Sequence, residues 1–469
     1  MNNIFKVILF FIFLTNCSFH KNSNFWTKEI IEKEDLKSKI ENKVEEIFLE
    51  EEAMNLEVNP NLKISLYSKA INKSFLNNYD NNNGRINYSG DLESISRFKF
   101  SKIDNFYQYN PTISFENNNI IFFDNKGSIL KFDQDSNLIW KKNYYSKSEK
   151  KLKPILLFAN NKKVLIVADN IAKYYALDIN TGELLWSKNN IAPFNSQIKI
   201  YKDRFFVIDI KNILRTYSIK DGTEIWKTKT QNSLIRSQKK LSMVIVDKKV
   251  YFNNSLGDIS AVDIKTGQLL WQIPTQNTLN YDGGFFLKNS DIIADKNTLY
   301  FSNNKNKFFS FDIKTGTLNW EQKINSNLRP TLIDNYIFTV SLEGYLIIIE
   351  KTSGNIIRST NIFRGIKTNF FSRTEKKTCQ KLFSFKNVPC ESINPSSKKK
   401  KRSKILPIGF IVGKDNIYLT TDNGRLLVID IVTGVTSSVI KIDNDKISRP
   451  FVLNNNLYII KDSSIIKLN

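Results

Sequence analysis

The chain has 469 residues, of which 41% are hydrophobic and 25% charged, and its 69 Lys and Arg against 46 Asp and Glu give a formal net charge of +23. This composition is typical of a folded soluble protein and excludes a disordered chain or a membrane protein with many spans. A single His, His20, and three Cys argue against a hydrolase or metalloenzyme, because serine–histidine triads, His-rich metal sites and haem attachment all need His side chains in the folded domain.

The N-terminus has the pattern of an export signal. Lys6 precedes an apolar run, Val7–Leu14, which is too short to cross roughly 30 Å of hydrocarbon as a helix. We therefore predict a signal peptide over residues 1–16. Cys17 follows three residues after the run and resembles the acylated cysteine of a bacterial lipobox, although the two residues before it are larger than usual. Ser18, rather than Asp, resembles the pattern for sorting to the outer membrane; ordinary cleavage that leaves Cys17 free is the alternative.

Residues 17–60 are predicted to be a lipid-anchored tether that contains one amphipathic helix. Between Thr27 and Glu57 the apolar residues recur at helical spacing, amid 11 acidic and 5 basic residues. The helix could rest on the main domain as a tether or dock a partner.

A repeat dominates the rest of the chain. Its unit is an apolar strand that reaches Asp, a Thr-Gly turn and a second strand that carries Trp. Asp178, Asp263 and Asp312 are predicted to hydrogen-bond their own turns, and Gly supplies the positive φ that the turn requires. Five Trp and four Gly occupy equivalent positions: Trp140, Trp186, Trp226, Trp271, Trp320, Gly182, Gly222, Gly267 and Gly316. Weaker copies have Arg358 and Ser438 at the Trp position.

The spacing of the repeat predicts a β-propeller. Each hairpin is preceded by another pair of strands, and the positions from 140 to 358 recur every 38 to 49 residues, the length of a four-stranded antiparallel blade. We expect residues 61–469 to form an all-β, eight-bladed propeller with an inter-blade insertion at 363–405. The last unit lacks a closing hairpin, so its missing strands are expected from around Leu92–Ser101; seven blades are the alternative.

The motif Ala-x-Asp-x-x-Thr-Gly-x-x-x-Trp resembles the PQQ-like propeller repeats, in which the Trp packs between blades. Together with the lipobox it is similar to the BamB family, the lipoproteins of the outer-membrane β-barrel assembly machinery. The resemblance implies a non-catalytic scaffold on the periplasmic face of the outer membrane, with no cofactor and no metal. It also implies a partner, the POTRA-containing barrel subunit BamA.

Quinoprotein dehydrogenases share the repeat and are one alternative. They resemble one another in a vicinal Cys pair, but this chain has no Cys-Cys dipeptide and no Cys-x-x-Cys-His motif. A propeller that binds an envelope polymer is a second alternative.

The resemblance places partner-binding residues in two inter-blade loops. Leu234 and Ile235 would be apolar anchors and Arg236 a charge-assisted donor. The Leu-Ile pair could instead simply begin the next blade's first strand. In the following loop only Asp282 stands near the family's acidic positions.

The insertion 363–405 has 13 Lys and Arg against two Glu. In an oxidising periplasm its Cys379 and Cys390 are expected to form a disulfide. Its charge could attract anionic lipid or an acidic partner, or could simply follow from the Lys-rich composition of the whole chain.

Overall fold

The computed structural model describes residues 55–70, 84–104, 106–230, 239–276, 287–364 and 405–469. The chain divides into two compact units, Met1–Glu52 and Ala53–Asn469. The first unit lies wholly outside the described residues, and so do the signal peptide, Cys17 and nearly all of the predicted amphipathic helix. Cys379, Cys390 and most of the basic insertion also lie outside them.

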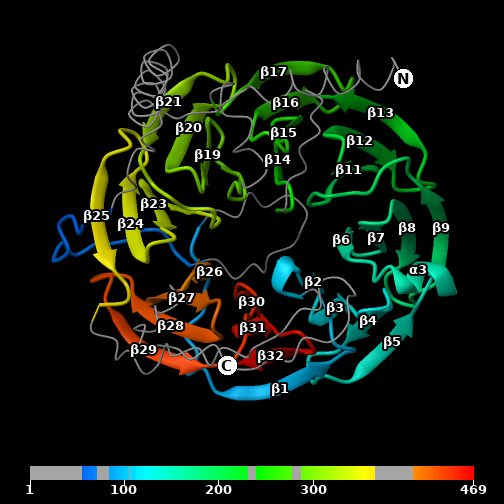
Figure 1. Cartoon of the computed structure of the whole chain (residues 1–469), viewed down its shortest axis with the longest axis horizontal. Helices are drawn as coiled ribbons and strands as arrows, with labels where there is room; N and C mark the ends of the chain where they lie inside the picture. Colours follow the sequence, from blue (N-terminus) through cyan, green and yellow to red (C-terminus); the bar gives the residue numbers. More distant parts are fainter. Residues whose placement is uncertain (1–54, 71–83, 105, 231–238, 277–286, 365–404) are drawn as a thin grey trace, which may run out of the picture. The chain divides into compact units, whose positions relative to one another are not determined.

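The second unit is an eight-bladed β-propeller. It contains eight four-stranded antiparallel sheets, which follow one another around a ring (Figure 1). Blades 1 to 4 are β2 (Ser114–Glu116), β3 (Asn119–Phe123), β4 (Ile129–Phe132) and β5 (Leu138–Lys142); β6 (Leu156–Asn160), β7 (Val164–Asp169), β8 (Lys173–Asp178) and β9 (Leu184–Asn189); β10 (Lys199–Tyr201), β11 (Arg204–Ile208), β12 (Ile213–Ser218) and β13 (Glu224–Lys229); β14 (Met243–Val246), β15 (Lys249–Asn253), β16 (Ile259–Asp263) and β17 (Leu269–Ile273).

The ring continues with four further blades. Blades 5 to 8 are β18 (Ile293–Ala294), β19 (Thr298–Asn303), β20 (Lys307–Asp312) and β21 (Leu318–Gln322); β22 (Thr331–Ile333), β23 (Tyr336–Val340), β24 (Tyr345–Glu350) and β25 (Ile356–Asn361); β26 (Pro407–Val412), β27 (Asn416–Thr421), β28 (Arg425–Asp430) and β29 (Thr436–Lys441); β30 (Phe451–Leu453), β31 (Asn456–Ile460), β32 (Ser464–Leu468) and β1 (Ser94–Lys99). In the described part of the chain, two short helices lie outside the blades, the 3-10 helix η1 (Phe106–Gln108) and α3 (Lys147–Lys151), which is capped by Ser146.

Burial follows the position of a strand in its blade. The second and third strands are buried along nearly their whole length, because both faces of each blade pack on neighbouring blades. The outermost strands, such as β9, are largely exposed. Between blades 2 and 3, for example, Tyr174, Trp186 and Phe205 pack in one apolar cluster, and the Trp186 and Phe205 rings stack with centroids 6.2 Å apart.

The Thr-Gly turns form as the sequence predicts. The Asp178 carboxylate accepts hydrogen bonds from the backbone N–H groups of Asn180 and Thr181, both at 2.9 Å. Gly182 follows with φ 71°. Asp263 and Asp312 accept equivalent bonds. These carboxylates are thus turn-forming groups, as expected.

The ring closes through a strand from the N-terminal side of the blades. β1 pairs antiparallel with β32, from Ser94 opposite Leu468 to Lys99 opposite Ser464, and becomes the outermost strand of blade 8 (Figure 1). This pairing confirms eight blades rather than seven and lies within the predicted source, Leu92–Ser101. The described chain contacts the blades even before residue 61: Val58 forms an isolated antiparallel bridge with Ser359 at the outer edge of blade 6.

Candidate functional site

Antiparallel order places two kinds of loop at one end of the propeller. The chain passes there from the fourth strand of a blade to the first strand of the next, and it also turns there between second and third strands. We call this the connection end. The predicted partner-binding residues Leu234, Ile235 and Arg236 belong to the connection from blade 3 to blade 4, and Asp282 belongs to the next one. All four lie outside the described residues, so the structure defines the supports of these loops.

The support of the first loop is formed by turns of blades 3 and 4. On its N-terminal side, the Thr230 hydroxyl donates to the Asn212 carbonyl at 2.8 Å. The Asn212 side chain in turn accepts from the Ser255 backbone N–H at 2.9 Å, so the turns of the two blades are tied together. On its C-terminal side, Leu241 exchanges backbone bonds of 2.9 Å with Asn195 and Gln197. Both ends of the loop are therefore fixed to the blades.

The described ends of the second loop contact blades 4 and 5. The Thr275 hydroxyl donates to the Gly257 carbonyl at 2.9 Å. Gly257 has φ 91°, and a Cβ built on it would lie 2.7 Å from the buried Leu287, so the turn tolerates no side chain there. The Lys288 N–H donates to the Asn304 side chain at 2.7 Å. The described ends of both loops are thus linked to the Asn254–Gly257 turn of blade 4, the first through Asn212 and the second through Thr275.

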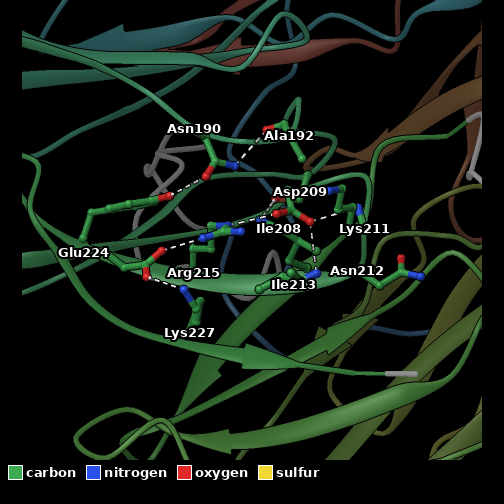
Figure 2. A network of polar contacts seen from close by, with 12 residues as sticks. Asn190, Ala192, Ile208, Asp209, Lys211, Asn212, Ile213, Arg215, Glu224 and Lys227 are labelled. Atoms are coloured by element: carbon green, nitrogen blue, oxygen red, sulfur yellow. Dashed lines mark hydrogen bonds and ion pairs between the residues drawn. The ribbon is translucent and has the colours of Figure 1, made fainter. Parts of the chain in front are cut away.

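Blade 3 contains a polar network whose centre, Arg215 and Asp209, is buried and whose outer members, Glu224 and Lys227, are exposed (Figure 2). Arg215 lies 2.9 Å from Asp209 through Nε and 2.5 Å from Glu224 through Nη1, and Glu224 also pairs with Lys227 at 3.2 Å. Burial works against the charge on Arg215, but its bonds to Asp209 and Glu224 raise its pKa above the ordinary value. This network joins β12 and β13 to the turn that holds Asn212, which supports the first loop.

Asp209 belongs to a recurring hydrogen-bond arrangement that was not predicted from the sequence. In blades 1 to 3 an Asp at the end of the second strand accepts two backbone N–H groups of the following turn through Oδ1. Its Oδ2 binds a cation or phenol: Asp124 and Lys141 at 3.1 Å, Asp169 and Tyr145 at 2.5 Å, Asp209 and Arg215 at 2.9 Å. The signal in the sequence was an Asp at the end of the apolar second strand in three consecutive blades, at Asp124, Asp169 and Asp209.

The repeat tryptophans lie on the outermost strands and meet the next blade. A Cβ built on Gly222 would lie 2.5 Å from the Trp186 ring, and the same contact joins Trp140 to Gly182, Trp226 to Gly267 and Trp271 to Gly316. The Trp186 indole N–H donates to the Ile219 carbonyl at 2.9 Å, and Trp226 and Trp320 donate to equivalent carbonyls. The Gly is therefore needed twice, for its positive φ and for the space that the ring fills.

Arg358 occupies the Trp position between blades 6 and 7. It is 0% exposed, and its Nη2 donates to the Ile431 carbonyl at 3.0 Å, which is the same acceptor position that the indoles use elsewhere. Its Nη1 also donates to the carbonyls of Val432 and Leu62, the latter at 3.0 Å. Arg358 thus replaces an inter-blade Trp and additionally holds the segment that precedes the blades.

Among the described residues, no group of three or more His, Cys, Asp or Glu side chains is arranged to hold a metal ion. In the same part of the chain, no helix is long and apolar enough to cross a membrane.

Comparison with known proteins places the chain in a family. The profile described as "Outer membrane protein assembly factor BamB" matches residues 125–360, half of the chain. Outer membrane protein assembly factor BamB of Shewanella oneidensis is 22% identical over 324 residues, which cover 63% of this chain and 79% of the relative.

Solved structures share the fold. BamB from Moraxella catarrhalis has a TM-score of 0.58 at 15% identity, over 81% of this chain and 99% of that one. A quinohemoprotein alcohol dehydrogenase from Comamonas testosteroni has the same TM-score at 10% identity, over 83% and 78%. At such identities the structural likeness shows the propeller alone. Because the family profile spans half of the sequence, the chain belongs to the family of the outer membrane protein assembly factor BamB.

Proposed function

We propose that this protein is a non-catalytic scaffold lipoprotein of the outer-membrane β-barrel assembly machinery. It is held by a lipid on Cys17 at the periplasmic face of the outer membrane, where it binds a POTRA-containing, BamA-like barrel subunit. Family membership carries the proposal, because the matched relatives are named as outer membrane protein assembly factors. The export signal and the lipobox-like Cys17 agree with that location.

The proposed contact lies at the connection end of blades 3 to 5. Leu234 and Ile235 supply apolar anchors and Arg236 a charge-assisted donor, with Asp282 in the neighbouring loop. Support comes from the fixed ends of both loops: the first is bound to Asn212 and to blade 3, and the second rests on the blade 4 turn. A loop whose ends are held loses less conformational freedom on binding.

The test is affinity capture. The tagged full chain is recovered from gently solubilised envelopes, and the proteins that accompany it are identified by mass spectrometry. We expect a POTRA-bearing barrel protein to be enriched with the wild type and reduced with Arg236→Glu. Lys265→Glu, a charge reversal in an exposed Thr-Gly turn at the opposite end of the propeller, is the control and should leave capture unchanged. Absence of the barrel protein from the wild-type sample contradicts the scaffold role; equal capture by a folded Arg236→Glu variant contradicts only the site.

The dehydrogenase alternative rests on fold likeness alone. The sequence has no vicinal Cys pair and no Cys-x-x-Cys-His motif, so the cofactor contact and haem partner common in those enzymes have no counterpart here. A redox spectrum that develops when quinone and calcium are added would favour the enzyme. Retention on purified peptidoglycan or lipopolysaccharide would favour a propeller that binds an envelope polymer.

A further inference from the structure

Five basic side chains gather at the connection end near the axis of the ring. Lys239 and Lys240 precede the first strand of blade 4, Lys288 precedes that of blade 5, and Lys446 and Arg449 precede that of blade 8. All five are half-buried. We call them the cation cluster. They come from three different connections, so the closed ring is what brings them together.

Contacts between non-adjacent blades show that these side chains reach across the axis. Arg449 Nη1 lies 3.9 Å from Asp291 Oδ2, although these residues precede blades 8 and 5, which are three blades apart. Lys239 Nζ donates to the Asn327 carbonyl, which precedes blade 6. Innermost segments that are not neighbours in the ring can meet in this way only over the central channel.

Arg449 is held in place from two sides. A Cβ built on Gly409 would lie 2.5 Å from the Arg449 Cβ, so the aliphatic stem packs directly on the backbone of blade 7. The guanidinium carbon lies 5.4 Å from the centre of the Phe451 ring, within the range of a cation–π contact. A positioned guanidinium is a ready donor for an oxyanion.

The basic side chains of the cluster lie close enough to act on one another. Arg449, Lys288 and Lys240 act on Lys239, Arg449 acts on Lys240, and Lys288 acts on Lys446. Asp291 acts on Lys239, Lys240 and Arg449, and Asp422 acts on Lys446. Burial lowers the pKa of Lys239 and Lys240 to about 8, with Arg449 acting in the same direction and Asp291 against it. Burial, together with Lys288, lowers the pKa of Lys446 to about 8. The folded state therefore disfavours this charge, and an anion between the side chains would relieve it.

We infer that the cation cluster binds a small multivalent anion that bears carboxylate or phosphate groups. The anion is expected to be small because the half-buried side chains of the cluster meet over the axis, where a macromolecular surface has little access. The anion is expected to be multivalent because several basic side chains from different blades can contact several of its oxygens at once. Lys239 and Lys240 follow Arg236 in the same connection, but the inference does not rest on the proposed partner.

The test measures binding of citrate and of inorganic phosphate to the full chain by isothermal titration calorimetry. Chloride is the monovalent reference, ionic strength is constant and the pH is 7. We expect citrate or phosphate to bind in preference to chloride; the two titrations distinguish a carboxylate from a phosphate ligand. Lys239→Gln/Lys240→Gln should weaken binding at least about tenfold, the effect expected when charge-assisted contacts are lost.

Two further variants make the test specific. Lys265→Gln/Lys314→Gln removes the same charge from exposed Thr-Gly turns and should bind as the wild type does. Asp291→Asn removes a carboxylate from the cluster and should tighten binding, a gain that a damaged fold cannot produce. No preference for either multivalent anion in the wild type overturns the proposal. An equal loss in the Lys265/Lys314 control, or no gain with Asp291→Asn, also overturns it.

Discussion

Replacing Arg358 tests how a buried cation substitutes for an inter-blade tryptophan. Arg358→Ala removes the donors to the carbonyls of Leu62, Ile431 and Val432; the contact with Ile431 is buried and the other two are part-buried. Three bonds at about 1–2 kcal/mol each amount to about 3–6 kcal/mol. Relief of the desolvated charge offsets part of this sum, since burial already lowers the pKa of Arg358 to about 10. We expect a net loss of about 3 kcal/mol in the free energy of unfolding.

The assay is urea unfolding followed by tryptophan fluorescence, because five of the six tryptophans lie at inter-blade positions and report on the ring. Arg364→Ala is the matched control. Its side chain is 72% exposed and pairs with Glu57 at 2.8 Å, so it also touches the segment before the blades. A surface pair of this kind contributes about 0–1 kcal/mol. If Arg358→Ala and Arg364→Ala unfold within about 1 kcal/mol of each other, the role assigned to Arg358 is wrong.

Arg358→Trp refines the argument. An indole can donate to the Ile431 carbonyl, as Trp186 does to Ile219, but it cannot also serve Leu62 and Val432. Its stability should lie between those of the wild type and the Ala variant. Limited proteolysis should cleave the segment around Leu62 faster in both variants, because its carbonyl loses the guanidinium in each.

Three further predictions concern buried charge, a turn and pH. Glu116→Gln should lower the free energy of unfolding by about 3 kcal/mol, measured by thermal unfolding. Lys131, which is 4% exposed and lies 3.0 Å from Glu116, would keep its buried charge without a carboxylate partner. A variant as stable as the wild type would contradict this. Gly222→Ala should lower the free energy of unfolding by about 2 kcal/mol or more, measured by urea unfolding. The φ angle of Gly222 is 68°, and the added methyl group would meet the Trp186 ring. A smaller loss would show that the ring can shift. In the cation cluster the pKa of Lys239 and Lys240 is about 8 in the folded state, below the ordinary 10.5. The folded chain therefore releases these protons at lower pH than the unfolded chain does. The penalty is complete below pH 8 and is relieved as the pH rises toward 10.5, so the wild type should gain stability relative to the cluster's double Lys→Gln variant between pH 7.5 and about 9.5; a constant difference would contradict the shift.

The propeller could be predicted because its determinants are local and repeated. An Asp, a Thr-Gly turn and a Trp recur within eleven residues, and each copy is constrained by the same hairpin and the same contact with the next blade. The number of these copies predicts the number of blades. The last unit, which lacks a closing hairpin, indicates where a strand from elsewhere in the chain is needed. Arg358 was found by the same count, as the residue at a Trp position.

What Arg358 does there could not be predicted, because its acceptors come from segments far from it in sequence. The cation cluster was hidden for the same reason: Lys239, Asp291 and Arg449 belong to separate connections without periodicity, and only closure of the ring sets their distances. Lys131 lies in the middle of a short apolar strand, where the pattern alone gives no indication of its partner Glu116.

The pairing of β1 with β32 has a consequence for the order of events in folding. β1 is synthesised before every other strand of the ring, and its partner is synthesised after every other strand. A chain that emerges from its N-terminus can form blades 1 to 7 from local hairpins, but blade 8 must wait for the far end of the sequence. Contacts of such long separation form slowly and leave strand edges exposed in the meantime. We therefore expect the last step of folding to be the joining of these two distant segments. The cation cluster, which needs residues of blade 8 beside those of blades 4 and 5, should be complete only after that step.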